Sequence, residues 1–146
     1  MSAADPSNPA AGSPGSLAVG PLAVRIDQAA AAALAWAVAP DGAEPTVPLI
    51  FPIRWLALPQ IHRALSELVD LSTVVLVHEA QGFVSAAPLC AGVDYVLAAR
   101  LTRSEGAAAR VMVTGTMRDA AGVDVGELHA TLRILPRGAA IAGAAQ

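Results

Sequence analysis

The spacing of hydrophobic residues along this chain changes near Asp70. In the stretch from Thr46 to Leu68, large apolar residues recur three to five positions apart, the spacing of a helix with one apolar face. The residues that carry this spacing are Leu49, Ile53, Leu56, Ile61, Leu65 and Leu68. After Asp70, apolar and polar residues alternate, as they do in strands with one buried face. The pattern therefore predicts a central helix followed by strands.

Prolines interrupt the predicted central helix. Pro52 suits a first helical turn, where its missing N–H would have no partner in any case. Pro59 lies too far along the same stretch for that explanation. Either one helix kinks at Pro59 or two helices meet at Leu58-Pro59, and we favour the kinked helix.

Four alternating segments follow the central helix. We predict strands in meander-like order at Thr73–Ala87, Val93–Arg103, Ala107–Asp119 and Val125–Leu135, joined by turns that each contain glycine. In the first strand, strict alternation predicts one face made of Val75, Val77, Glu79, Gln81 and Phe83, and an opposite face made of Val74, Leu76, His78, Ala80 and Val84. An antiparallel sheet with one face packed on the helix is an α+β fold.

The chain before the central helix predicts a strand and a short helix. Leu17–Ile26 fits an edge strand that the pair Gly20-Pro21 interrupts with a bulge or turn. Asp27 is placed to cap an alanine-rich helix at Gln28–Val38, and Pro40-Asp41-Gly42 ends that helix as a turn. Segments 1–16 and 137–146 are poor in bulky apolar residues and are predicted to be disordered tails around one domain at 17–136.

Composition and charge exclude several classes of function. A net charge of −3 and the absence of a basic cluster give nucleic-acid binding little support. Cys90 is the only cysteine, which excludes a disulfide framework and a cysteine-based zinc site, and we predict neither a metal nor a cofactor. No apolar run is long enough for a membrane span and no signal peptide is evident, so we expect a cytoplasmic protein. The apolar content of 55% favours an oligomer.

Three segments carry a family resemblance. They are VPLIFPIRWLALPQIHRAL, LVHEAQGF and PLCAGVDYVLAARL, and with the strand and helix before them they resemble the MaoC-like acyl-thioester dehydratase and hydratase family across Leu17–Pro136. The resemblance implies a hotdog fold, in which an antiparallel sheet wraps around a central helix. It also implies a substrate that is an acyl thioester of coenzyme A or acyl carrier protein, and assembly as a homodimer or higher oligomer.

The family's catalytic loop is where this sequence departs from the resemblance. The family adds water to enoyl thioesters with the aspartate and histidine of a D-x-N-P-x-H loop before the central helix. Here the corresponding segment is APDGAEPTVPL, in which Asp41 stands near the place of the aspartate. No Asn-Pro follows Asp41 and no histidine precedes His62. The chain therefore resembles family members without the pair, which serve as the inert half of a double hotdog or form a heteromer with an active MaoC-like subunit.

Six residues are candidates for a functional site, each with a plainer alternative. As catalytic groups we consider Asp41, His62 and His78. In the plainer alternative, Asp41 is only a turn residue, His62 is a partly buried helix histidine and His78 is a structural histidine of the sheet. As substrate-binding groups we consider Arg54 for coenzyme A phosphates, its neighbour Trp55, and Gln81 as a polar lining. An ion pair at the surface is the alternative for Arg54.

Three functions stay open at this point. The chain is either a MaoC-like hydratase or dehydratase, a non-catalytic hotdog subunit that pairs with an active one, or an acyl-CoA thioesterase. A thioesterase of this fold would use a carboxylate on the central helix, for which Glu67 is the candidate. The alternative for Glu67 is a solvated position in the last helical turn.

Overall fold

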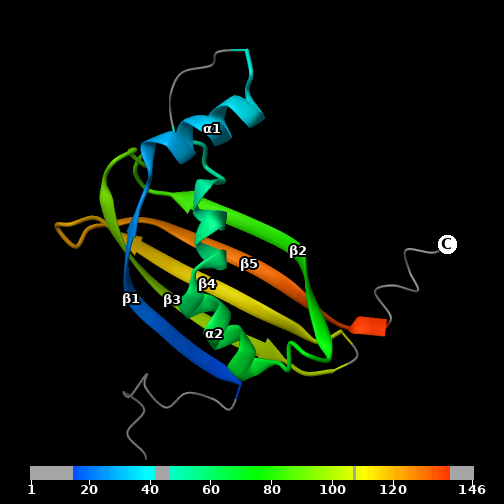
Figure 1. Ribbon diagram of the computed structural model, residues 1–146. Helices are drawn as coiled ribbons and strands as arrows, with labels where there is room; N and C mark the ends of the chain where they lie inside the picture. The colour runs from blue at the N-terminus through cyan, green and yellow to red at the C-terminus, as the bar shows by residue number, and fades with distance from the viewer. Residues whose placement is uncertain (1–14, 42–46, 107, 139–146) are drawn as a thin grey trace, which may run out of the picture.

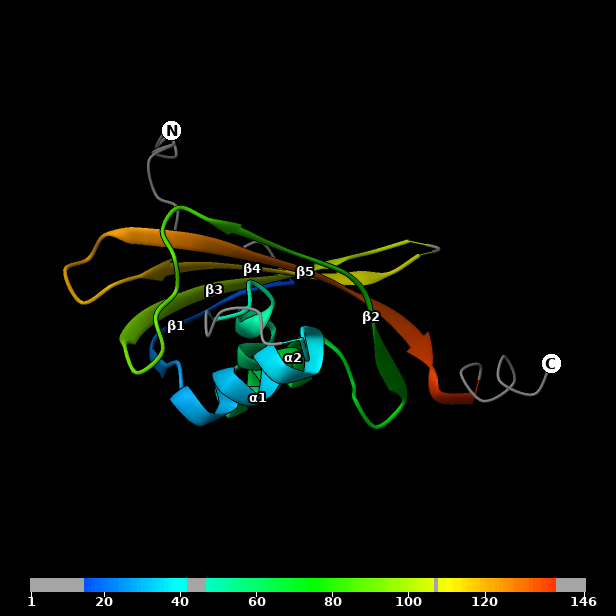
Figure 2. The ribbon, with the colours of Figure 1, turned by 90° about the horizontal axis from the view of Figure 1, so that it is seen from above.

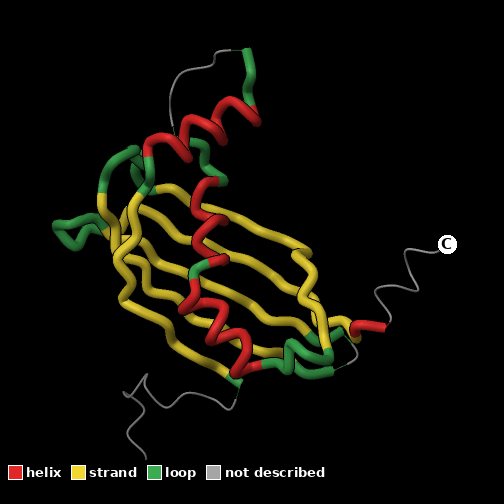
Figure 3. Tube along the Cα trace, in the orientation of Figure 1, coloured by secondary structure: helices red, strands yellow, loops and turns green. Residues whose placement is uncertain are grey.

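The computed structural model describes residues 15–41, 47–106 and 108–138. Within them the helices are α1 (Gln28–Val38), the 3₁₀ helix η1 (Phe51–Ala57) and α2 (Pro59–Leu68). The strands are β1 (Ser16–Arg25), β2 (Val74–Ser85), β3 (Asp94–Ser104), β4 (Arg110–Arg118) and β5 (Asp124–Pro136). Figures 1 and 3 show η1 and α2 lying end to end across one face of a single sheet, and Figure 2 shows the sheet curving over them. The predicted α+β class is confirmed.

The sheet is antiparallel throughout, with the strand order β1-β3-β4-β5-β2. The predicted meander holds for β3, β4 and β5 only. β2 pairs with β5 at the far edge instead of lying beside β3, so the expected four-strand meander is wrong in this respect. β2 and β3 follow each other in the chain but are not neighbours in the sheet, because residues 86–93 connect them across its end (Figure 1). As a result β1 and β2 form the two edges.

The predicted N-terminal strand and the helix that follows it are confirmed, whereas residues 1–14 of the predicted tail and Gly42 of the predicted turn lie outside the described residues. β1 contains a register shift between Val19 and Leu22, at the cis Gly20-Pro21 bond. Gly20 has a φ of 103°, and a Cβ there would lie 2.6 Å from the Leu97 carbonyl oxygen, so only glycine fits. Asp27 caps α1 because its Oδ2 accepts a hydrogen bond of 2.8 Å from the Ala30 N–H.

The central helix consists of two helices, so the favoured kinked helix is wrong. η1 ends at Ala57, Leu58 adopts an extended backbone, and α2 begins at Pro59 in a first-turn position. The break follows from Pro59, because a proline disfavours helical backbone at the residue before it and cannot donate to the preceding turn. Both prolines therefore sit at helix starts, where they are tolerated.

The 3₁₀ geometry of η1 sorts its side chains into rows, because residues three apart eclipse each other. Phe51 and Arg54 form one such pair, with the guanidinium 5.4 Å from the ring centroid. Pro52 and Trp55 form a second, buried pair. The third row is Ile50, Ile53 and Leu56, which lies on the side of η1 that faces β2.

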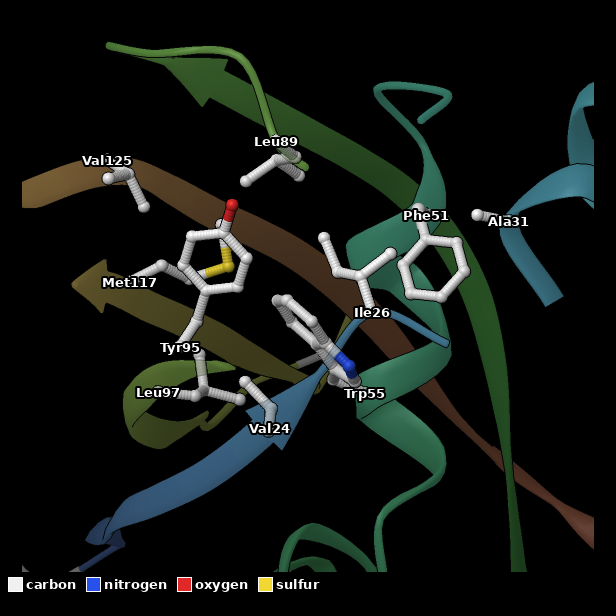
Figure 4. Close-up of a cluster of buried hydrophobic side chains, with 10 residues drawn as sticks. All are labelled: Val24, Ile26, Ala31, Phe51, Trp55, Leu89, Tyr95, Leu97, Met117 and Val125. Atoms are coloured by element: carbon white, nitrogen blue, oxygen red, sulfur yellow. The ribbon is translucent and has the colours of Figure 1, made fainter. Parts of the chain in front are cut away.

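Two groups of buried side chains fill the space between sheet and helices. The group at the η1 end, drawn in Figure 4, is Val24, Ile26, Ala31, Phe51, Trp55, Leu89, Tyr95, Leu97, Met117 and Val125. The group at the α2 end is Ile61, Ala64, Leu65, Val69, Ala99, Leu101, Val111, Val113, Ala130 and Leu132. Alternate residues of β3 and β4 and most of those of β5 are therefore buried, as alternation of apolar and polar residues requires, and the sheet packs on both helices of the central pair.

Candidate functional site

A groove runs between the central helices and β2, and it consists of two adjacent hollows. The first hollow, of about 240 Å³, is lined by Leu49, Ile50, Pro52, Ile53, Gln81, Gly82, Phe83 and Leu128. The second, of about 410 Å³, is lined by Ile53, Leu56, Ala57, Ile61, His62, Leu65, Leu71, Leu76, His78, Val113 and Leu132. We call the two together the β2-side groove. Its lining is apolar apart from one amide and two imidazoles.

A β-bulge in β2 decides which side chains face this groove. His78 pairs with Leu132 and Ala80 with Thr131, so Glu79 is the extra residue and the alternation reverses after it. Beyond the bulge Gln81 pairs with Ala130 and therefore points to the helix side, as His78 does before it. The predicted assignment of His78 and Gln81 to opposite faces is thus wrong, because one unpaired residue shifts the phase.

Glu79 and Phe83, which strict alternation predicts on one face, lie on opposite faces for the same reason. Phe83 pairs with the buried Leu128 and lines the first hollow. Glu79 lies on the other face, where its carboxylate accepts two bonds from Arg110, of 2.5 Å to Nε and 2.9 Å to Nη2. These bonds from Arg110 hold the pKa of the Glu79 carboxyl below its usual value. The ion pair fixes the bulged part of β2 to β4.

The structure brings three of the six candidate residues to the β2-side groove. His62, from α2, and His78, from β2, both line the second hollow. Gln81 lines the first hollow and is its polar side chain. All three are exposed to solvent, so a ligand can reach them. Their catalytic and binding roles stay predictions.

Asp41 lies apart from the groove. It is an exposed turn residue that follows α1, and it is absent from the lining of both hollows. The neighbouring segment 42–46, which completes the region where the family loop is expected, lies outside the described residues. Among the described residues that line the groove there is no aspartate or glutamate. The described lining residues of the groove therefore include two imidazoles and no carboxylate.

Arg54 and Trp55 lie on the opposite side of η1, toward β1. Trp55 is 5% exposed and meets Phe51 edge to face at 6.2 Å between ring centroids, within the buried group of Figure 4. Arg54 is exposed and shares a hollow with Arg25 and Asp27. Neither residue lines the β2-side groove. Their proposed contact with a substrate therefore requires a ligand that extends beyond that groove.

Glu67 also faces β1. It lines a hollow formed with Gln60, Arg63 and residues of β1, and it is exposed. The alternative made for it, a solvated carboxylate in the last turn of α2, matches this position. It does not lie with His62 and His78 in the groove.

Sequence reasoning missed the row Ile50, Ile53 and Leu56 as a groove wall. The available signal was the spacing of three between these residues, which is also compatible with an α-helix over so short a stretch. The described residues contain no group of three or more histidine, cysteine or carboxylate side chains that could hold a metal ion. No helix within the described ranges has the length and apolar character needed to cross a membrane.

An antiparallel sheet of this strand order, wrapped around a central helix, is the hotdog fold. The chain matches a 3R-hydroxyacyl-ACP dehydratase, the HadBC complex from Mycobacterium tuberculosis, with a TM-score of 0.61 and 19% identity, covering 81% of this chain and 95% of that one. A MaoC-like dehydratase matches with a TM-score of 0.59 and 20% identity, covering 82% of this chain and 41% of that one. These matches confirm the expected structural likeness to MaoC-like proteins.

Thioesterases of the same fold match equally well. A mutant of the fluoroacetyl-CoA-specific thioesterase FlK, in a complex with fluoroacetate and CoA, has a TM-score of 0.62 at 12% identity, covering 84% of this chain and 94% of that one. No protein-family model matches the sequence, and no curated protein matches it either. At these identities the matches establish the fold, and the chemistry has to be argued from the groove.

Proposed function

We propose that this chain is a hotdog subunit that binds the acyl group of a coenzyme A or acyl-carrier-protein thioester in the β2-side groove, without catalysing water addition by itself. The observation that carries the proposal is the lining of the groove: apolar walls, three polar side chains, and no carboxylate among the described lining residues. Apolar walls suit an acyl chain, and a few polar groups suit its thioester end.

Reversible hydration of an enoyl thioester needs a base to activate water and an acid to protonate the carbon chain. The family pattern supplies these as aspartate and histidine. In this chain the histidines are His62, His78 and His129, and Asp41, the candidate for the family aspartate, is not among the described lining residues of the groove. The similarity to HadBC, whose structure is that of a complex, supports a role beside an active hotdog partner.

β2 is the surface that we propose for assembly. It is an edge strand of 12 residues, and edge strands offer backbone donors and acceptors to another chain. Val77 and Val84 of β2 are 42% and 63% exposed, which adds apolar surface beside that edge. We expect light scattering to give at least twice the chain mass of 14.7 kDa, either as a homo-oligomer or on addition of an active subunit. A monomer under both conditions would contradict this.

The test of the function measures binding and turnover on the same sample. Crotonyl-CoA is titrated into the purified chain by calorimetry, and loss of the enoyl absorbance is followed in parallel. The proposal predicts heat of binding without hydration or hydrolysis. Absence of binding would overturn the proposal, and so would turnover by the pure chain that a single groove histidine controls.

A hydrolase or hydratase is the second candidate, because His62 and His78 line the same hollow. An imidazole there could act as a general base on water. In that case His62→Ala or His78→Ala abolishes turnover, whereas His129→Ala leaves it unchanged. His129 is the matched control because it sits on the outer face of β5 and is 3.4 Å from Glu127. The first proposal predicts no turnover for any of these proteins.

A further inference from the structure

The two hollows of the β2-side groove have one lining residue in common. Ile53 lines both, while every other residue of their linings belongs to one hollow only. Its side chain is partly exposed, so it stands in the groove itself and is not part of the buried core. Ile53 therefore lies at the junction of the two spaces.

The geometry of η1 explains why a single residue takes this place. Ile50, Ile53 and Leu56 form one row because a 3₁₀ helix repeats every three residues. Ile50 lines the first hollow only, and Leu56 lines the second only. The row runs along the groove, and its middle member separates the two ends.

The opposite wall changes at the same point. On β2, the second hollow is lined by residues up to His78 and the first by residues from Gln81 onward. Between them lies the bulge at Glu79, whose side chain points to the other face and bonds Arg110. The boundary between the two hollows thus lies at Ile53 on the helix side and at the bulge of β2 on the sheet side.

We propose that Ile53 sets the length of the acyl chain that the groove accepts, an inference that rests on the proposed acyl-thioester binding. A short acyl group fills one hollow and stops at Ile53. A long acyl chain extends into the other hollow only by displacing the Ile53 side chain. Branching at Cβ restricts the rotation of that side chain about χ1. The hollows on either side are apolar, so each gains affinity from the methylene groups that it takes up.

The experiment compares chain-length preference in matched variants. Butyryl-CoA and dodecanoyl-CoA are titrated by calorimetry into the full-length wild type, Ile53→Ala and Ile50→Ala. Ile50→Ala removes the same side chain from the same row without opening the junction. We expect Ile53→Ala to shift the ratio of the two dissociation constants by about tenfold in favour of the long chain. Ile50→Ala leaves that ratio within about twofold of wild type.

A second substitution tests the same inference in the opposite direction. Ile53→Phe adds bulk at the junction and is expected to weaken dodecanoyl-CoA binding while leaving butyryl-CoA binding near wild type. Circular dichroism and thermal unfolding establish that each variant is folded, and Ile53→Val gives the smaller form of the expected shift if Ile53→Ala unfolds. Equal ratios for the Ile53 and Ile50 variants would overturn the role of Ile53 alone. A folded wild type that binds neither thioester would instead overturn the proposed function, and with it this inference.

Discussion

The two sides of the central helix pair differ in the charges they present. On the β1 side the hollows are lined by groups of both signs, including Arg25, Asp27 and Arg54 at one end and Arg63 and Glu67 at the other. On the β2 side no arginine, lysine, aspartate or glutamate is among the described lining residues. One helix pair therefore separates a charged surface from an apolar groove.

The two sides of the helix pair also differ in packing. Large aromatic residues of η1, Phe51 and Trp55, point toward the β1 side and into the core, where they stabilise the fold. The aliphatic row of η1 points toward β2, where space is left open. Transfer of an acyl chain out of water is favourable only where the surrounding walls are apolar. The β2 side is therefore the side on which we expect an acyl chain to bind.

The largest expected effect concerns the packed side. Trp55→Ala removes a ring that is 5% exposed and should lower the free energy of unfolding by about 3–5 kcal/mol. Urea denaturation followed by circular dichroism measures it. Trp36→Ala is the matched control, because Trp36 is 68% exposed and its loss should cost less than about 0.5 kcal/mol. Equal costs for the two tryptophans would contradict the assignment of the core to this side.

The second prediction places a charge on each side of the helix pair. Leu56→Glu puts a carboxylate into the second hollow and should weaken dodecanoyl-CoA binding about 100-fold, since the charge loses its hydration when the chain binds. Gln60→Glu introduces the same carboxylate on the β1 side and should leave the affinity within about twofold. Calorimetric titration gives both values. Similar losses of affinity in both variants would contradict binding of the acyl chain on the β2 side.

The third prediction concerns the wall that Phe83 forms. A Cβ at Gly126 would lie 2.6 Å from Cζ of Phe83 and 2.8 Å from the Val84 carbonyl oxygen, so Gly126→Ala must displace β2. We expect a loss of about 1–3 kcal/mol in unfolding free energy. Gly82→Ala is the control, because a Cβ there meets no atom within 4 Å. Urea denaturation that ranks the two variants in the opposite order would show that Phe83 lies elsewhere.

The smallest expected effect is the pH dependence of the bulge. The hydrogen bonds from Arg110 lower the folded-state pKa of Glu79 below its ordinary 4.5. A carboxyl with a depressed pKa contributes stability above its unfolded-state pKa, and loses it as the pH falls through the folded-state value. Wild type should therefore exceed Glu79→Gln in urea midpoint at about pH 7, with the difference vanishing once the pH has fallen below the folded-state pKa of Glu79.

The control for this titration is Glu67→Gln, which removes an exposed carboxylate that lies away from the bulge. Its difference from wild type should stay small at both pH values. A Glu79→Gln difference that persists at low pH would mean that the ion pair with Arg110 is not its source.

Much of the fold follows from patterns that act locally. Asp27 caps α1 with its own side chain, and the inward residues of β3 such as Tyr95 and Leu97 alternate without interruption. Such features depend on neighbours in sequence, so periodicity and capping preferences predict them. The pairing of β2 with β5 depends on contacts between distant segments, and alternation alone cannot order strands along a sheet.

The site was harder to predict because it depends on two irregularities. Nothing in the sequence around His78 and Gln81 shows that Glu79 is unpaired, since bulged and regular strands have similar composition. The spacing of Ile50 and Ile53 fits a 3₁₀ helix and an α-helix alike over so short a stretch. The sequence therefore suggested His78 and Gln81 as site candidates, a role that stays a prediction, whereas the face on which each lies follows from the structure.

The most direct test of the central claim is methyl NMR on the wild-type chain with labelled isoleucine, titrated with dodecanoyl-CoA. Ile50 and Ile53 report on the β2-side groove, whereas Ile26 is fully buried in the core group of Figure 4. Binding in the groove predicts large shifts of the Ile50 and Ile53 methyl signals and a nearly unchanged Ile26 signal. Saturable binding that leaves Ile50 and Ile53 unshifted would contradict it.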